Sequence, residues 1–208
     1  MFEYPSMKNT KKAKFGQMVF VFEKIDGSNF RAKWTRKHGF NLFGTRTQLV
    51  DESTDYWGNI VKLFNETRAD ALSKYFTDKT KADNIIVFSE YHGDNSFAGR
   101  HVDDEPHKLT VFDVYDPKIK SFMGPENFIN RIGSVTEIPR VFATTELNYE
   151  LVQDVREGKY DVVEGVICKG TERKGNFAGG VPMYKIKTMQ YLDRLKEMFK
   201  DSWEEYGE

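Results

Sequence analysis

The feature that most limits how this chain can fold is a pair of strand-like runs separated by a glycine turn. The first run, 18–22, is continuously apolar, which is typical of a buried strand. Asp26 and Gly27 then favour a turn, and 29–34 begin a second strand. Lys24 stands between the first run and the turn, where the missing side chain of the glycine leaves room for a ligand. The pattern therefore predicts two joined strands that present a lysine.

Lys24 has an ordinary interpretation and a chemical one. Asp-Gly turns are common, so a solvated lysine before a hairpin is one alternative. The other is a nucleophile. A lysine amine attacks phosphorus only in its neutral form, and nearby cations favour that form. A nucleophilic lysine at this position would therefore need other cations close to it.

Residues 183–188 supply two such cations. Their apolar and polar positions alternate strictly, so in a strand Lys185 and Lys187 share one face. Two ammonium groups on one face repel each other unless they share an anion or face water. One alternative is an amphipathic edge strand with solvated lysines. The other is a phosphate site whose field also favours a neutral Lys24.

Two carboxylates interrupt apolar strands. Glu90 lies in the predicted strand 85–91, and Glu164 lies in the predicted strand 162–168. Buried carboxylates are costly unless they are paired or bound to a metal. Gly165 follows directly, which indicates the close approach of a ligand or of another backbone. The first carboxylate could bind ribose hydroxyls and the second a divalent metal, and the alternative for each is a salt-bridged strand end.

Four short motifs, in this order, resemble those of the covalent nucleotidyltransferase superfamily of ATP-dependent ligases and mRNA capping enzymes. They are Lys-Ile-Asp-Gly at 24–27, Phe-Ser-Glu at 88–90, Glu-Gly-Val at 164–166 and Lys-Ile-Lys at 185–187. Residues 23–30 most resemble the nick-sealing RNA ligases of T-even phages and the kinetoplastid RNA-editing ligases. DNA ligases and capping enzymes more often carry arginine where this chain has Asn29. The resemblance covers about 20–190 and implies an α+β fold, with antiparallel sheets flanked by helices.

The resemblance also implies a role for each candidate site residue. Lys24 takes AMP from ATP, while Lys185 and Lys187 neutralise the phosphate charge. Glu164 holds one Mg²⁺ or Mn²⁺ ion, and Asp26 either holds metal-bound water or orients the nucleophile. The remaining candidates are expected to bind the nucleotide: Glu23 at the amino edge of adenine, Phe112 stacked on adenine, Glu90 and Arg46 at the ribose, and Asn29.

Some of these positions have ordinary alternatives. Phe112 lies in the apolar run 108–114, where a phenylalanine usually packs in the core. Arg46 lies in 44–47 and could be a loop arginine in solvent. A basic group in a glycine-rich stretch could follow a nucleic-acid backbone or could simply be a solvated surface. Its members are Lys169, Arg173 and Lys174.

Composition limits the class of protein. At 208 residues, with 39% hydrophobic and 30% charged residues, the chain is typical of a globular protein with one substantial core. A net charge of −1 argues against a protein held to nucleic acid mainly by long-range attraction. No membrane partner is expected because no apolar run approaches the ~18 residues of a membrane span. The N-terminus has no apolar signal region, so we expect a cytoplasmic location, and the phage proteins in the resembled family leave a phage origin open. The single cysteine, Cys168, permits no internal disulfide and is predicted to be a packed thiol.

Periodicity outlines the elements. Strands are expected near 19–23, 29–36, 40–45, 85–91, 108–115, 162–168 and 183–187. Helices are expected near 55–76, 125–132, 146–157 and 189–204. We expect residues 1–208 to form a single nucleotidyltransferase (adenylyltransferase) domain, without the C-terminal oligonucleotide-fold domain of DNA ligases and capping enzymes.

The expected function is that of a monomeric ATP-dependent RNA ligase. It would join 3′-hydroxyl and 5′-phosphate ends of RNA, or of RNA/DNA strands, through a lysyl-AMP intermediate and an adenylated 5′ end. A DNA ligase, an mRNA guanylyltransferase and an inactive nucleic-acid-binding relative are the alternatives. The last is disfavoured because a binding module has no use for the full set of Lys24, Glu164, Lys185 and Lys187.

Overall fold

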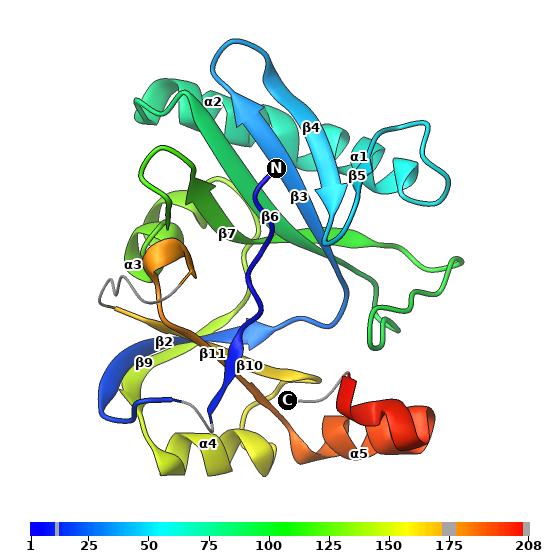
Figure 1. Cartoon of the computed structure of the whole chain (residues 1–208), viewed down its shortest axis with the longest axis vertical. Coiled ribbons are helices and arrows are strands. Elements are labelled where there is room, and N and C mark those ends of the chain that lie inside the picture. The colour runs from blue at the N-terminus through cyan, green and yellow to red at the C-terminus, as the bar shows by residue number, and fades with distance from the viewer. Residues whose placement is uncertain (11–12, 172–177, 206–208) are drawn as a thin grey trace. The chain divides into compact units, whose positions relative to one another are not determined.

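The computed structural model describes residues 1–10, 13–171 and 178–205, and these form two compact units (Figure 1). The six-stranded unit comprises 1–5, 27–138 and 178–180. The five-stranded unit comprises the other described residues, which are 6–10, 13–26, 139–171 and 181–205. Each unit contains its own sheet.

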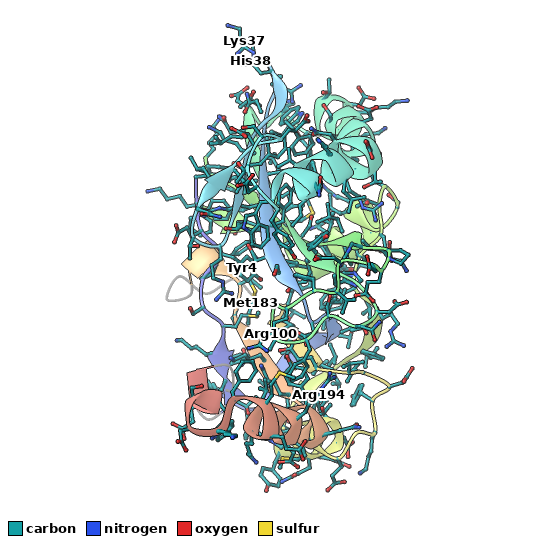
Figure 2. The ribbon with its side chains drawn as sticks, turned by 90° about the vertical axis from the view of Figure 1, so that its right-hand side faces the viewer. Tyr4, Lys37, His38, Arg100, Met183 and Arg194 are labelled. Atoms are coloured by element: carbon teal, nitrogen blue, oxygen red, sulfur yellow. The ribbon has the colours of Figure 1, made fainter. Side chains whose placement is uncertain are left out.

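In the six-stranded unit every neighbouring pair of strands is antiparallel, in the order β5-β4-β3-β6-β7-β8. The strands are β3 (Ser28–Thr35), β4 (Gly39–Thr45), β5 (Leu49–Val50), β6 (Asn84–His92), β7 (Lys108–Asp116) and β8 (Ser121–Phe122). Lys37 and His38 lie at the tip of the hairpin between β3 and β4 (Figure 2).

A long helical segment covers one face of this sheet (Figure 1). It runs through α1 (Gly58–Phe64), a π-helical turn (Asn65–Ala69) and α2 (Asp70–Lys79). Phe64 packs on Phe30, and Phe76 packs on Trp34, with ring centres 5.5 Å apart in both pairs. All four rings are buried, so the apolar helical face predicted near 55–76 is the face that forms the core. The shorter α3 (Pro125–Asn127) continues into a second π-helical turn (Phe128–Ile132).

The five-stranded unit has the strand order β1-β11-β10-β2-β9, antiparallel except for the pair of β1 and β11. Its strands are β1 (Lys8–Asn9), β2 (Gln17–Lys24), β9 (Val141–Leu147), β10 (Gly165–Gly170) and β11 (Met183–Lys187). Helix α4 (Tyr149–Arg156) packs on one face of this sheet, and α5 (Met189–Phe199) follows β11. The core beneath α4 consists of Val19, Val21, Leu147, Leu151, Val152, Val155, Val166, Cys168, Tyr184 and Ile186.

The α+β class with antiparallel sheets is confirmed, and all the long predicted strands are present. Strand β9 was not predicted, and its last two residues had been assigned to the helix expected at 146–157. Strand β10 begins at Gly165, so Glu164 stands immediately before the strand instead of inside it. Cys168 is fully buried, which confirms the predicted packed thiol, and this burial raises its pKa to about 12. Among the described residues no helix has the length and apolar character needed to cross a membrane.

Candidate active site

Three neighbouring strands of the five-stranded unit bring two of the predicted lysines together. Gly165 on β10 is paired with Lys24 on β2 on one side and with Lys187 on β11 on the other. Adjacent strands lie about 4.8 Å apart, so the two lysine backbones are separated by about two strand spacings. The residue between them, Gly165, has no side chain that could separate the two lysine side chains.

The carboxylate of Glu164 occupies the space between the two amines. Its Oε2 accepts a hydrogen bond from Lys24 Nζ at 2.6 Å, and its Oε1 lies 3.0 Å from Lys187 Nζ. The side chains of Glu164 and Lys187 are 4% and 6% exposed, and that of Lys24 is 19% exposed. We call Lys24, Glu164 and Lys187 the lysine cluster. Its formal charge is +1, which suits a site for a phosphate.

Gly165 is required for this arrangement. A Cβ at this position would lie 2.0 Å from the carbonyl oxygen of Ile186 on β11, far inside any real contact. Its φ of 156° is also a conformation that other residues rarely adopt. The predicted close approach is therefore that of another backbone, and it draws β10 against β11 beside the lysine cluster.

Two further lysines lie on the same face of the sheet as the lysine cluster. Lys185 is half-buried and shares the face of Lys187 by strand alternation, as predicted. Lys169 is 4% exposed, and its amine lies 4.9 Å from the centre of the Phe22 ring. Lys169 was predicted only as part of a basic group, and the other two members, Arg173 and Lys174, lie outside the described residues.

Asp26 is held by a residue that sequence reasoning missed. Tyr191, in the first turn of α5, donates its hydroxyl hydrogen bond to Asp26 Oδ2 at 2.8 Å. The amine of Lys187 lies 4.8 Å from the centre of the same tyrosine ring. The helix around 189–204 was predicted, but helical periodicity identifies a buried face and not its partner. The only sequence signal for this contact was the motif position of Asp26, which indicates that its carboxylate needs a hydrogen-bond donor.

Glu23 has a different environment from that of Lys24. Strand alternation places it on the core face of the sheet, opposite the lysine cluster. There its two carboxylate oxygens accept hydrogen bonds from Nε and Nη2 of Arg140 at 2.8 and 3.1 Å. These bonds raise the pKa of Arg140 above its ordinary value. An adenine contact through this carboxylate would compete with Arg140, so the predicted role stays a prediction.

A cavity of about 240 Å³ lies beside Arg140 in the five-stranded unit. Residues of α5 form one side of it, and Figure 2 shows Arg194 on that helix. Its lining consists of Arg140, Asp161, Val162, Val163, Gln190, Tyr191 and Arg194. Of its two arginines, Arg140 is paired with two carboxylates, those of Glu23 at 2.8 Å and Asp161 at 3.1 Å. The charge of Arg140 beside this cavity is therefore balanced by its own carboxylate partners.

The six-stranded unit contains the other nucleotide-binding candidates. Asn29 on β3 is paired directly with Glu90 on β6, so the two side chains share one face of the sheet. That face is opposite the one covered by α1 and α2, because Phe30 points toward the helices. Among the residues that the structure describes, the buried Oδ1 of Asn29 has no hydrogen-bond partner. A buried amide oxygen of this kind is available to a ligand donor.

Tyr4 is the centre of this second group and was not predicted. Its buried hydroxyl donates to Asp113 Oδ2 at 2.6 Å, and its ring stands edge-on to the half-buried Phe112, 5.0 Å away. Burial raises the pKa of Tyr4 well above its ordinary value, and the charge of Asp113 adds to the rise. The charge of Glu90 adds to this rise in the pKa of Tyr4, and the charge of Arg46 opposes it.

Comparison with known proteins identifies the family. The model of the family described as RNA ligase matches residues 17–187, which is most of the chain. The chain belongs to the RNA ligase family. The match spans every motif of the lysine cluster, and it extends over both units. A search of curated protein sequences gave no match.

Solved structures of RNA ligases share this fold. A lysine-to-alanine variant of the Naegleria gruberi RNA ligase with ATP and Mn is 15% identical, with a TM-score of 0.67, over 91% of this chain and 57% of the other. An archaeal ATP-dependent RNA ligase is 19% identical, with a TM-score of 0.69, over 95% and 51%. The Naegleria gruberi RNA ligase with PPi is 15% identical, with a TM-score of 0.68, over 95% and 58%. The chain thus spans little more than half the length of these solved RNA ligases.

Proposed function

We propose that this chain is the nucleotidyltransferase part of an ATP-dependent RNA ligase, in which both units serve one reaction. One observation carries the proposal most directly: a single buried carboxylate bridges Lys24 and Lys187 across Gly165. These are the residues that the resemblance assigns to the nucleophile, the phosphate and the metal. The family match and the ATP, PPi and Mn of the solved relatives support the same reaction.

The first step is the transfer of AMP to Lys24. The amine attacks the α-phosphorus of ATP, the new N–P bond forms, and the bond to pyrophosphate breaks. Lys24 is hydrogen-bonded to Glu164 Oε2 at 2.6 Å as an ammonium, so it must release one proton before it can attack and a second as the N–P bond forms. Water takes up these protons, because Glu164 stays ionised to hold the cation. Lys187 and Lys185 lie on the same sheet face and can neutralise charge that develops on the phosphate. The product carries no ammonium at Lys24, so the ion pair with Glu164 ends when the AMP is attached.

Glu164 is the carboxylate that could hold a hard divalent cation such as Mg²⁺ or Mn²⁺, and the ion would then replace at least one of the ammonium groups that now pair with its two oxygens. Mg²⁺ is usually bound by one or two carboxylates together with phosphates and waters. We assign Glu164 to hold the ion, and Asp26 either to hold metal-bound water or to orient Lys24. When bound, the ion would neutralise negative charge on the triphosphate.

The six-stranded unit is assigned to the nucleoside. Phe112 is half-buried beside Tyr4, so one part of its ring remains available for stacking on adenine. Glu90 offers a carboxylate for ribose hydroxyls from the same sheet face as Asn29. Arg46 is exposed, so its positively charged side chain is available to contact the ribose or an incoming strand end. These roles agree with the placement of each side chain, and each is a prediction.

The later steps use RNA ends as substrates. AMP passes from the lysine to a polynucleotide 5′-phosphate, and a 3′-hydroxyl then displaces AMP and joins the strands. A DNA ligase and a guanylyltransferase are the alternative enzymes. The family match favours RNA, and a terminal ribose 2′-hydroxyl can be sensed directly because it both donates and accepts hydrogen bonds. We also propose that this chain is a monomer in solution, and light scattering would test this by measuring its molecular mass.

Mass spectrometry tests the first step. Incubation of the chain with ATP and Mg²⁺ should add one AMP to the peptide that contains Lys24, and GTP should not replace ATP. Lys24→Ala should abolish the adduct. Lys159→Ala is the matched control, because Lys159 is a surface lysine of the same unit that also pairs with a carboxylate. An adduct that persists unchanged in Lys24→Ala would refute the assignment.

A nick-sealing assay tests the substrate. Pre-adenylated nicked duplexes should differ only in whether the nucleotides at the 3′-hydroxyl end are ribose or deoxyribose. We expect faster sealing of the ribose nick, and we expect sealing to weaken as the salt concentration rises. Equal or faster sealing of the all-DNA nick would favour a DNA ligase instead.

A further inference from the structure

One buried side chain of α5 contacts two residues of the candidate active site. Tyr191 is 3% exposed. Its hydroxyl donates to Asp26 Oδ2 at 2.8 Å, and its ring centre lies 4.8 Å from the amine of Lys187. All three residues belong to the five-stranded unit. The proposed function gives chemical roles to Asp26 and Lys187, but it gives none to the tyrosine that holds them.

The start of α5 is itself fixed beside the lysine cluster. The hydroxyl of Thr188 accepts a hydrogen bond from the backbone N–H of Tyr191 at 3.1 Å, and it caps the helix. The same hydroxyl donates to the carbonyl of Val163 at 3.2 Å, and the N–H of Thr188 donates to the carbonyl of Glu164 at 2.9 Å. The helix therefore begins at a set position relative to the chain that precedes β10, and this fixes the tyrosine ring.

Both contacts of Tyr191 restrict charged groups. A hydrogen bond from the hydroxyl to a carboxylate is charge-assisted, so it stabilises the ionised form of Asp26 and one orientation of its side chain. An aromatic ring beside an ammonium attracts it and limits the positions that the long lysine side chain can occupy. Lys187 is thus held from two sides, by the ring and by Glu164. Sites of this kind work when their groups are held in place before the substrate arrives.

We propose that Tyr191 is a positioning residue that holds Asp26 and Lys187 in the orientations needed for AMP transfer to Lys24. This rests on the proposed function, and it deepens that function by adding a residue outside the four motifs. Tyr191 acts through the two residues that it contacts. If it only filled space in the core, its loss would lower stability and leave the reaction rate of the folded protein unchanged.

The first test is Tyr191→Phe, which removes the hydroxyl and keeps the buried ring over Lys187. We expect the maximal rate of adduct formation to fall about tenfold, because the variant loses one hydrogen bond to a charged group. The ATP concentration that gives half the maximal rate should stay unchanged. Tyr160→Phe is the matched control, because Tyr160 lies in the same unit, packs on Phe142 and has no contact with the lysine cluster. The two variants should unfold at similar temperatures.

A double-mutant cycle with Asp26→Asn tests whether Tyr191 acts through Asp26. If it does, Tyr191→Phe should add less than about a twofold loss when Asp26→Asn is already present. Long single-turnover incubations keep slow variants measurable. The positioning role would be overturned if Tyr191→Phe caused the same tenfold loss in the wild-type and the Asp26→Asn backgrounds. It would also be overturned if Tyr191→Phe alone reacted as fast as the wild-type chain.

The ring contact has its own test. Tyr191→Leu keeps an apolar side chain but removes the ring, so we expect a further loss of about fivefold relative to Tyr191→Phe. That further loss should disappear in the Lys187→Ala background. A wild-type chain that forms no AMP adduct would refute the proposed function and this role with it. A wild-type chain that forms the adduct at the same rate as Tyr191→Phe would refute the role of Tyr191 alone.

Discussion

The two units hold their candidate residues by different interactions. In the five-stranded unit, Lys24, Glu164 and Lys187 contact one another directly through buried ion pairs. In the six-stranded unit, Phe112 and Asp113 are instead gathered around Tyr4 by ring packing and one neutral donor. Charge changes should therefore be costly in the first unit, while the second unit should respond mainly to changes in shape and hydrogen bonding. Each variant below tests this contrast.

The largest effect is expected at Glu164. Glu164→Gln removes the only negative charge between Lys24 and Lys187 in the lysine cluster and leaves two ammonium groups facing a neutral amide. Removing one partner of such a buried pair costs about 3 kcal/mol of unfolding free energy. Adduct formation should also be lost at every Mg²⁺ concentration, because an amide lacks the charge that a hard cation requires. Denaturant unfolding and adduct assays measure the two effects, and full stability with full activity would remove Glu164 from both roles.

The lysines beside the phosphate should come next. Lys187→Ala and Lys185→Ala should each slow adduct formation about a hundredfold, since each removes a charge-assisted contact to the transition state. Single-turnover rates at saturating ATP measure this loss. Lys196→Ala is a suitable control because Lys196 pairs with Asp193 on the surface of α5. If both site variants react at the wild-type rate, the lysines are ordinary charged groups of the sheet face.

A smaller effect is expected in the six-stranded unit. Tyr4→Phe leaves the buried carboxylate of Asp113 without its 2.6 Å donor, which should cost about 1 to 2 kcal/mol of unfolding free energy. Because Phe112 packs edge-on to this ring, the variant should also need more ATP to reach half the maximal rate. The maximal rate itself should stay close to that of the wild-type chain. A large fall in the maximal rate would break the contrast between the two units.

The smallest effect concerns pH and His101. Burial lowers the pKa of His101 below its ordinary value of 6.5; His107 and His92 also lower it, while Glu105 and Asp103 oppose the shift. The unfolded chain therefore binds this proton more readily, so stability is complete above about pH 6.5 and falls as the pH drops toward the folded-state pKa. His101→Gln should flatten this part of the curve. Melting temperatures between pH 7 and about pH 5 would show it, and an unchanged slope would assign the dependence to other groups.

Strand alternation predicted that the two lysines of one strand share a face of the sheet. It placed Lys185 and Lys187 together on one face of their strand, as the structure has them. It could not predict partners, because the register between β2, β10 and β11 depends on Gly165 and on packing of the whole sheet. The bridge through Glu164 therefore emerges only from the structure.

The residues that sequence reasoning missed share one property. Tyr4 and Tyr191 act through a single hydroxyl on a carboxylate far away in sequence, 109 and 165 positions distant. No local pattern marks such a tyrosine, since hydrophobic periodicity does not identify hydrogen-bond partners. Strand β9 was missed for a related reason, because its side chains alternate weakly between buried and exposed positions.

The sequence separation of the lysine cluster has a consequence for how the protein folds. Lys24 meets Glu164 across 140 positions of chain, and Tyr191 meets Asp26 across 165. The entropy cost of closing such loops comes before the contacts can compensate for it, so non-local contacts of this kind slow folding and tend to form late. Neither unit is a continuous piece of sequence, which adds to the delay. The ability to accept AMP should therefore appear only with the last stage of folding, and adduct formation during refolding would time the completion of the native topology.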